Sequence, residues 1–161
     1  MLYEEKIIET IPVGPLGLIP LKSCTELGDK VNAYLVDWRR ERESEHKSTI
    51  AFSGYQRESY IIGASTPRFG TGEAKGTLSE SVRGDDLYIM VDVCNYSLTY
   101  SLCGMTNHMS PDDHYQDLKR VIAAAAGKAR RINVIMPFLY ESRQHKRSGR
   151  ESLDCALALQ E

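Results

Sequence analysis

Basic residues cluster after an apolar run in the C-terminal part of the chain. The apolar run 132–138 has the length of a strand, and the polar segment 141–150 follows it. This segment carries several basic side chains: Arg143, Lys146, Arg147 and Arg150. An arginine offers a planar fork to two phosphate oxygens, and Gln144 offers an amide that can hydrogen-bond the edge of a base. The pattern suggests a phosphate-binding or nucleotide-binding loop, whereas composition alone favours a solvated basic loop.

Glycines punctuate the segment 70–76, whose spacing is G-x-G-x-x-x-G. A dinucleotide-binding fingerprint needs G-x-G-x-x-G before a helix, and a Walker A loop needs G-K-[ST] at its end. Neither pattern occurs at 70–76, and no amphipathic pattern begins directly after it. Because glycine is a common turn residue, the segment is interpreted as a flexible hairpin loop.

Two smaller polar groups each allow two interpretations. Ser81 and Arg83 precede an apolar run and could hold an anion at a sheet edge, but an ordinary turn is the favoured interpretation. His114 follows Asp112 and Asp113, which together could suit a metal ion. Their place at the start of a helical pattern favours helix-capping acids and a surface histidine instead. No residue is therefore predicted to ligate a metal.

Strand-like and helix-like segments alternate along the chain and must position these residues. Strands are expected at 16–21, 49–52, 60–62, 87–93 and 132–138. Helices are expected after a cap at Ser23 or Thr25, over 115–127 and over 153–159. The segment 94–110 is polar and is expected to be irregular. This alternation predicts an α/β fold with a mostly parallel sheet flanked by helices, a fold that binds ligands at the carboxyl ends of its strands.

The composition is that of one ordinary globular domain. The chain has 161 residues, 42% of them hydrophobic, and a formal net charge of −2. Such a charge gives no bulk reason to expect nucleic acid or an anionic membrane as a partner. The apolar runs fall far short of the roughly 20 residues of a membrane helix, and no export signal opens the chain. The four irregularly spaced cysteines are therefore expected to be reduced thiols in a soluble cytoplasmic protein.

Three stretches of the sequence resemble the ribose-phosphate pyrophosphokinases, also called phosphoribosyl pyrophosphate synthetases. R-F-G-T-G-E at 68–73 and S-V-R-G at 81–84 are similar to the R-F-S-D-G-E and N-V-R-G motifs of that family, at the same spacing. The segment 137–146 is similar to the family's P-Y-F-x-Y-x-R-Q-D-x loop, and G-R-E at 149–151 to the element opening its next helix. The resemblance begins at about residue 16 and covers about the first half of a family member.

The resemblance implies a domain organisation and a function. The chain 1–161 is expected to be a single N-terminal α/β domain, similar to type I phosphoribosyltransferases, of a longer two-domain enzyme. The family uses magnesium and transfers pyrophosphate from ATP to ribose 5-phosphate, which gives phosphoribosyl pyrophosphate. Its catalytic-metal histidine, pyrophosphate loop and ribose-5-phosphate loop find no counterpart in this sequence. The chain is therefore expected to bind ATP, to form homo-oligomers and to be inactive alone.

The resemblance assigns the roles of the family's site residues to matching positions of this sequence. Arg143 and Gln144 would contact ATP, with Arg143 stabilising the charge of the phosphates during catalysis. Phe69 and Glu73 would close over the adenine of a neighbouring subunit, together with Thr71 in the same loop. Thr71 stands where the family has an aspartate, which removes one carboxylate acceptor for the adenine amino group.

Further positions match or depart from the family pattern. Ser81 and Arg83 match positions near the family's allosteric phosphate or ADP site. His145 replaces the aspartate after the Arg-Gln pair, and Glu141 replaces the second tyrosine of the loop. The segment 94–110 is longer than the usual family connection.

Two other functions remain open at the level of sequence. The first is a non-catalytic module for nucleotide binding and assembly, which would need neither a metal histidine nor a downstream phosphate loop. The second is a type I phosphoribosyltransferase, which would need a D-D-x-x-x-T-like loop after a strand. That loop is absent from these 161 residues.

Overall fold

A parallel sheet lies at the centre of the computed structural model, which describes residues 12–44 and 56–161. Its strands are β1 (Leu16–Pro20), β4 (Asp86–Met90) and β7 (Arg131–Ile135), in the order β1-β4-β7. The predicted α/β fold with a parallel sheet is thereby confirmed. β1 and β4 are largely buried, as expected of apolar runs in a covered sheet. The strand expected at 132–138 ends at Ile135, and it lies at the edge of the sheet, where Val134 and Ile135 are 42% and 39% exposed.

The predicted strand at 60–62 forms a short parallel bridge along β1. The amide of Leu18 donates to the carbonyl oxygen of Tyr60, and the amide of Ile62 donates to that of Leu18, both at 2.8 Å. Tyr60 and Ile62 are each only 1% exposed, so this segment belongs to the core. The strand expected at 49–52 lies outside the described residues.

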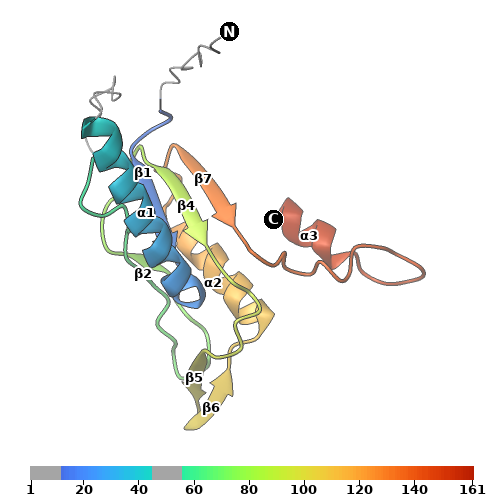
Figure 1. Cartoon of the computed structure of the whole chain (residues 1–161). Coiled ribbons are helices and arrows are strands. Elements are labelled where there is room, and N and C mark those ends of the chain that lie inside the picture. The colour runs from blue at the N-terminus through green and yellow to red at the C-terminus, as the bar shows by residue number, and fades with distance from the viewer. Residues whose placement is uncertain (1–11, 45–55) are drawn as a thin grey trace.

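Helices cover both faces of the sheet (Figure 1). A short 3₁₀ turn, η1 (Lys22–Cys24), leads into α1 (Thr25–Ser44), which packs on the face that carries Leu18 and Tyr88. α2 (Pro111–Ala124) covers the opposite face, which carries Leu87 and Ile89. Consecutive residues of one strand pack against different helices, because successive side chains point to opposite faces of the sheet. No helix in the described part of the chain has both the length and the apolar character to cross a membrane.

The ends of α2 follow from its sequence. Ser110 and Asp113 form a capping box, in which the Ser110 hydroxyl accepts from the Asp113 amide and the Asp113 carboxylate accepts from the Ser110 amide. The predicted role of the acidic residues as caps is confirmed. Beyond the helix, Gly127 has a φ of 65°, a conformation that glycine adopts without strain. The helix expected to end near residue 127 stops at Ala124, and the first residue with a left-handed backbone beyond its C-cap is Ala126, with a φ of 50°.

The chain also forms two small antiparallel pairs of strands. The helix expected at 153–159 is present as the short helix α3 (Asp154–Gln160). β2 (Ala64–Ser65) and β3 (Thr77–Leu78) bracket the glycine segment, and β5 (Thr99–Leu102) pairs with β6 (Met105–His108). The second pair corrects the expectation that 94–110 is wholly irregular. The hairpin is polar and turns through Cys-Gly, not the usual Asn-Gly, so the ordinary sequence signal for a hairpin is weak.

Candidate functional site

The carboxyl ends of the sheet strands form the edge where an α/β fold binds ligands. The segment after β1 is tied there to the segment after β4. The hydroxyl of Ser23 accepts a hydrogen bond of 3.0 Å from the Asp92 amide, and the carbonyl oxygen of Ser23 accepts one of 3.1 Å from the Asn95 side chain. The polar segment that follows β7 leaves the sheet from the same edge. Two groups of residues predicted from the sequence lie near this edge: the basic loop after β7 and the glycine loop at 67–76.

The basic loop, residues 141–150, begins beyond the carboxyl end of β7. Arg143 is exposed and forms no hydrogen bond or ion pair with any other residue that the structure describes. The remaining basic side chains of the loop are exposed as well: Lys146, Arg147 and Arg150. The loop thus offers several positive charges to solvent at the edge where a ligand would bind.

Gln144 has a structural role in this loop. Its side-chain amide donates to the carbonyl oxygens of Lys146, at 3.3 Å, and of Ser152, at 3.0 Å. These bonds close the basic loop on itself and bring it back toward α3. The contact of Gln144 with a base edge stays a prediction, and these donor bonds would have to be exchanged for it to form.

Tyrosine side chains fix the start of the basic loop against α2. Tyr140 donates a hydrogen bond of 2.7 Å to the carboxylate of Asp112, and its ring stacks on that of Tyr115 with centroids 4.2 Å apart. Burial first, and then the bond to Asp112, raise the pKa of Tyr140 well above its ordinary value. The charged part of the loop therefore starts from a fixed point.

The glycine loop, residues 67–76, is a closed hairpin, as the sequence predicts. Arg68 and Ala74 form an antiparallel bridge, and the amide of Phe69 donates to the carbonyl oxygen of Glu73 at 2.7 Å. Thr71 donates its hydroxyl to the Glu73 carboxylate at 3.0 Å. The structure therefore brings the predicted residues Phe69, Thr71 and Glu73 together, and all three are exposed. A solvent-facing aromatic ring, 53% exposed at Phe69, is suited to stacking on a planar ligand.

A buried ion network anchors the glycine loop to α2. The carboxylate of Asp117 accepts from Arg68 at 2.9 Å, from Arg120 at 2.7 Å and from the hydroxyl of Thr66 at 3.0 Å. Its side chain is only 6% exposed, so the charge depends on these donors. Sequence reasoning missed the network, although a signal was present. Asp117 lies on the apolar stripe of α2, four residues before Val121, and an acidic residue on a buried face needs a partner.

His114 corrects the expectation of a surface histidine. It is 2% exposed, and its Nε2 lies 2.9 Å from the carbonyl oxygen of Asn95. Its position one helical turn before Leu118 places it on the buried face of α2, which the polar neighbours in the sequence obscure. Within the described ranges, no group of three or more His, Cys, Asp or Glu side chains is placed to hold a metal ion.

A small pocket of about 160 Å³ with a mixed polar and apolar lining lies where the glycine loop, hairpin β5–β6 and α2 meet the end of β1. Ser23, Thr66, Arg68, Tyr100 and His114 are among the residues that line it. Two long basic side chains line it, Lys22 and Arg68, and Arg68 pairs with Asp117 at 2.9 Å. The Arg68 side of the pocket is therefore taken up by structural contacts, and the positive charge exposed at this edge lies in the basic loop and on Lys22.

Ser81 and Arg83 lie at the other edge of the sheet, in the turn that precedes β4. The amide of Asp85 donates to the carbonyl oxygen of Val82 at 3.2 Å, and Gly84 within this turn has a φ of 83°. The interpretation of an ordinary turn is confirmed, with Ser81 and Arg83 both exposed. No hydrogen bond or ion pair among the described residues joins this turn to the glycine loop or to the basic loop, so an anion site here would be separate.

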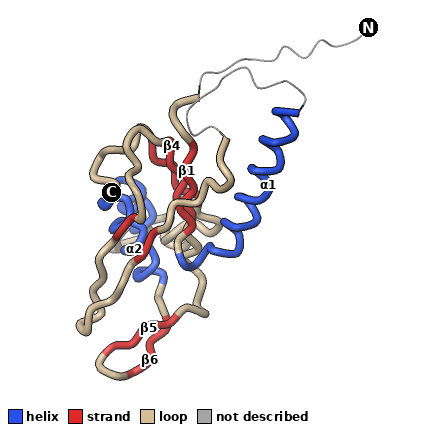
Figure 2. Tube along the Cα trace, turned by 90° about the vertical axis from the view of Figure 1, so that its left-hand side faces the viewer, coloured by secondary structure: helices blue, strands red, loops and turns tan. Residues whose placement is uncertain are grey.

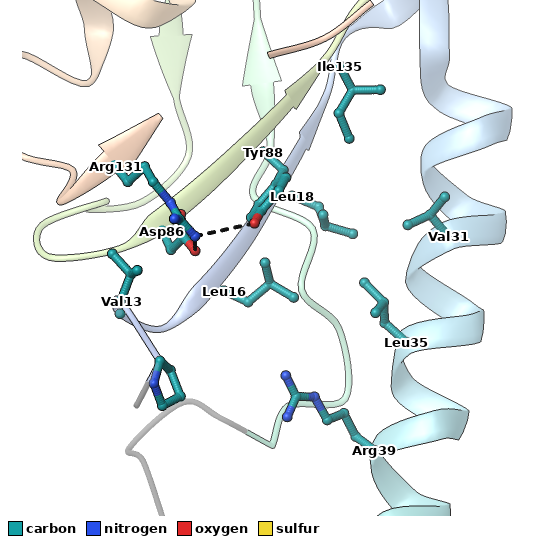
Figure 3. A pocket seen from close by; sticks show the side chains of 12 residues that line it. Val13, Leu16, Leu18, Val31, Leu35, Arg39, Asp86, Tyr88, Arg131 and Ile135 are labelled. Atoms are coloured by element: carbon teal, nitrogen blue, oxygen red, sulfur yellow. Dashed lines mark hydrogen bonds and ion pairs between the residues drawn. The ribbon is translucent and has the colours of Figure 1, made fainter. Parts of the chain in front are cut away.

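A larger pocket of about 550 Å³ lies between α1 and the sheet (Figure 3). Most of its walls are apolar, with Leu16, Leu18 and Leu35 among them. Arg131 forms a two-pronged ion pair with Asp86, with nitrogen–oxygen distances of 2.7 and 2.6 Å. Because that charge is balanced within the pocket, the Arg131–Asp86 pair offers little attraction to a phosphate ligand.

Comparison with known proteins places these features in a family. The model of the family "N-terminal domain of ribose phosphate pyrophosphokinase" matches residues 16–161. The fold is similar to that of phosphoribosylpyrophosphate synthetase from Mycobacterium smegmatis, with a TM-score of 0.57 and 23% sequence identity. The similarity covers 89% of this chain and 37% of that one, so the chain spans well under half the length of that protein. No curated protein matches the chain.

Proposed function

The chain belongs to the family of N-terminal domains of ribose phosphate pyrophosphokinase, and on that premise we propose that it is the ATP-binding half of such an enzyme. In this proposal, 1–161 is a single N-terminal domain of a longer two-domain cytoplasmic protein. The whole enzyme transfers pyrophosphate from ATP to ribose 5-phosphate, and this half is inactive by itself. The observation that carries the proposal is the exposed Arg143, without a partner among the described residues, in a basic loop at the carboxyl edge of the sheet.

In this reaction the anomeric hydroxyl of ribose 5-phosphate attacks the β-phosphorus of ATP. The bond from that phosphorus to the oxygen bridging to the α-phosphate breaks, and AMP leaves. Phosphoryl chemistry of this kind depends mainly on positioning and on neutralising charge. Arg143 would bind the phosphates and stabilise the charge that develops on them, with the remaining basic residues of the loop adding to the local positive field.

The glycine loop would bind the adenine of ATP held by a neighbouring subunit. Its exposed residues Phe69 and Glu73 offer a ring for stacking and a carboxylate that can accept from the adenine amino group. Thr71 donates to that carboxylate, so it orients Glu73 and leaves one carboxylate fewer for the base than the usual family pattern. This arrangement requires a homo-oligomer, which we include in the proposal.

Magnesium would enter with the nucleotide. The described residues contain no cluster of metal-ligating side chains, and Mg²⁺ commonly binds through substrate phosphates and water. When bound, the ion would neutralise charge on the phosphates. Ser81 and Arg83 would form a regulatory phosphate site at the opposite edge of the sheet, which suits a site that is distinct from the substrate site.

The test is calorimetric titration of the chain with ATP, with and without magnesium, alongside an assay for phosphoribosyl pyrophosphate formation. We expect binding without turnover. Replacing Arg143 by alanine should weaken ATP binding by about 1–3 kcal/mol, the usual scale for a charged hydrogen-bonding group. The matched control is Arg40→Ala, which removes the same charge from an exposed position on α1 and should leave binding unchanged.

Three results would contradict parts of the proposal. Unchanged affinity in a folded Arg143→Ala variant would remove Arg143 from the site. Formation of phosphoribosyl pyrophosphate by the chain alone would show that its catalytic parts are complete. Absence of ATP binding would leave assembly as the remaining role.

The alternative function is a non-catalytic module for nucleotide binding and assembly. Both functions would bind adenine with the same reduced set of groups, because Thr71 replaces the usual aspartate and the Gln144 amide donates within its own loop. The two functions differ in the parent protein. The enzyme needs a metal-binding histidine and a pyrophosphate loop downstream, and the module needs neither.

A further inference from the structure

The hairpin β5–β6 projects beyond the sheet as an arm of its own (Figures 1 and 2). Its first strand packs on the glycine loop. The ring of Tyr100 lies under the guanidinium of Arg68, with 4.9 Å from the Arg68 Cζ to the ring centroid. Gly72 lies against the same strand, since a methyl group at that position would be 3.4 Å from Leu102 and 3.8 Å from Tyr100. The hairpin therefore contacts the glycine loop at two places: at the base of the loop, through Arg68, and near the tip of the loop, at Gly72.

The base of the hairpin is fixed to the rest of the domain. The Asn95 side chain donates to the carbonyl oxygen of Ser23 after β1, and the Asn95 carbonyl oxygen bonds the buried ring of His114 on α2. The ring of Tyr96 stacks on that of His108 with centroids 4.2 Å apart, which closes the base of the hairpin, where β5 begins and β6 ends. Because its base is anchored, the hairpin can restrict the movement of the glycine loop that packs on it.

Arg68 connects this arm to the anchor of the glycine loop. One face of its guanidinium meets the Tyr100 ring, while its nitrogens donate to Asp117 and to the carbonyl oxygen of Gly72. Its side chain is 11% exposed, so the contact with the ring is largely shielded from water and correspondingly favourable. Loss of the ring would remove the contact of the hairpin with Arg68 and would leave Leu102 as the hairpin residue that packs on Gly72, so the loop would be held less firmly.

We propose that the hairpin β5–β6 holds the glycine loop in its binding conformation, with Tyr100 and Leu102 as positioning residues for the contact with adenine. This proposal rests on the proposed function, because the adenine contact itself belongs to Phe69 and Glu73. A loop that is already ordered loses less conformational entropy when a ligand binds, so the hairpin raises affinity without touching the nucleotide.

The experiment measures two properties of the chain and its variants. Hydrogen exchange reports the protection of the glycine-loop amides, three of which are hydrogen-bonded within the loop: those of Phe69, Gly72 and Lys75. Calorimetry with MgATP reports affinity. In Tyr100→Ala we expect loop exchange to accelerate and MgATP affinity to fall, each by about 3- to 10-fold, the range of a partly shielded cation–π contact.

Two control variants separate positioning from general damage. Tyr100→Phe keeps the ring and should behave as the unsubstituted chain does. Met105→Ala removes a side chain that is 65% exposed on the other strand of the same hairpin, and it should leave loop exchange unchanged.

The outcomes distinguish this proposal from the proposed function. Unchanged loop exchange in Tyr100→Ala would overturn the positioning role, as would faster exchange with unaltered MgATP affinity. If the unsubstituted chain binds no MgATP, the adenine function fails and the affinity effect with it. In that case, faster exchange of the loop amides in Tyr100→Ala would still show that the hairpin keeps the glycine loop ordered.

Discussion

Asp117→Asn is the substitution that most directly tests how the candidate site is held together. The change keeps the size of the side chain and removes its negative charge. In the structure this carboxylate receives hydrogen bonds from Arg68, Arg120 and Thr66 at 2.7 to 3.0 Å, and its side chain is 6% exposed. An amide can accept at one oxygen only and would turn a donor toward one of the two guanidinium groups.

The expected magnitude follows from these contacts. Breaking a buried ion pair by removing one partner costs about 3–5 kcal/mol, because the other charge is left uncompensated. Arg120 is 20% exposed and can turn toward water, and Arg68 keeps a second carboxylate, Asp113, at 3.8 Å. Both features reduce the cost, so we expect Asp117→Asn to lower the free energy of unfolding by about 3 kcal/mol. For a domain of this size, that loss lowers Tm by about 6–12 °C.

The assay is urea denaturation followed by circular dichroism, with a thermal scan of the same variants. Thr66→Val removes one neutral donor and should cost only about 1 kcal/mol. Glu26→Gln removes a surface ion pair with Lys30, in which both side chains are highly exposed, and should be indistinguishable from the unsubstituted chain. An Asp117→Asn variant no less stable than Thr66→Val would refute the network as the anchor of the glycine loop.

Two further predictions concern α2 and its neighbours. Ser110→Ala removes the N-cap hydroxyl and should destabilise the chain by about 1 kcal/mol in urea denaturation, whereas Ser110→Thr keeps a hydroxyl and should cost much less. The raised pKa of Tyr140 predicts a stabilising contribution that is fully present below about pH 10, the ordinary tyrosine value, and is lost as pH rises through the raised pKa. Denaturation midpoints compared between pH 8 and pH 11 should therefore fall less in Tyr140→Phe; an equal fall would assign the alkaline loss to other groups.

The sequence alone determined the architecture and the loops that carry the candidate residues. The apolar runs that became β1, β4 and β7 alternate with amphipathic helices, and this local pattern is sufficient for a parallel α/β sheet. The glycine spacing identified a hairpin, and the acidic residues at 112 and 113 identified a helix start, because turn and cap preferences depend on neighbouring residues only. The family also follows from local motifs, which the match over 16–161 confirms.

Tertiary structure decided how those loops are supported. The Arg68–Asp117 bond joins residues 49 positions apart, and the Tyr100 ring reaches Arg68 from a hairpin that polar composition concealed. His114 is buried because the rotation of α2 against the sheet, and not its polar sequence neighbours, decides which side chains face inward. Pairings of this kind depend on where separate elements pack, so they are fixed only when the whole sheet, both helices and the hairpin come together.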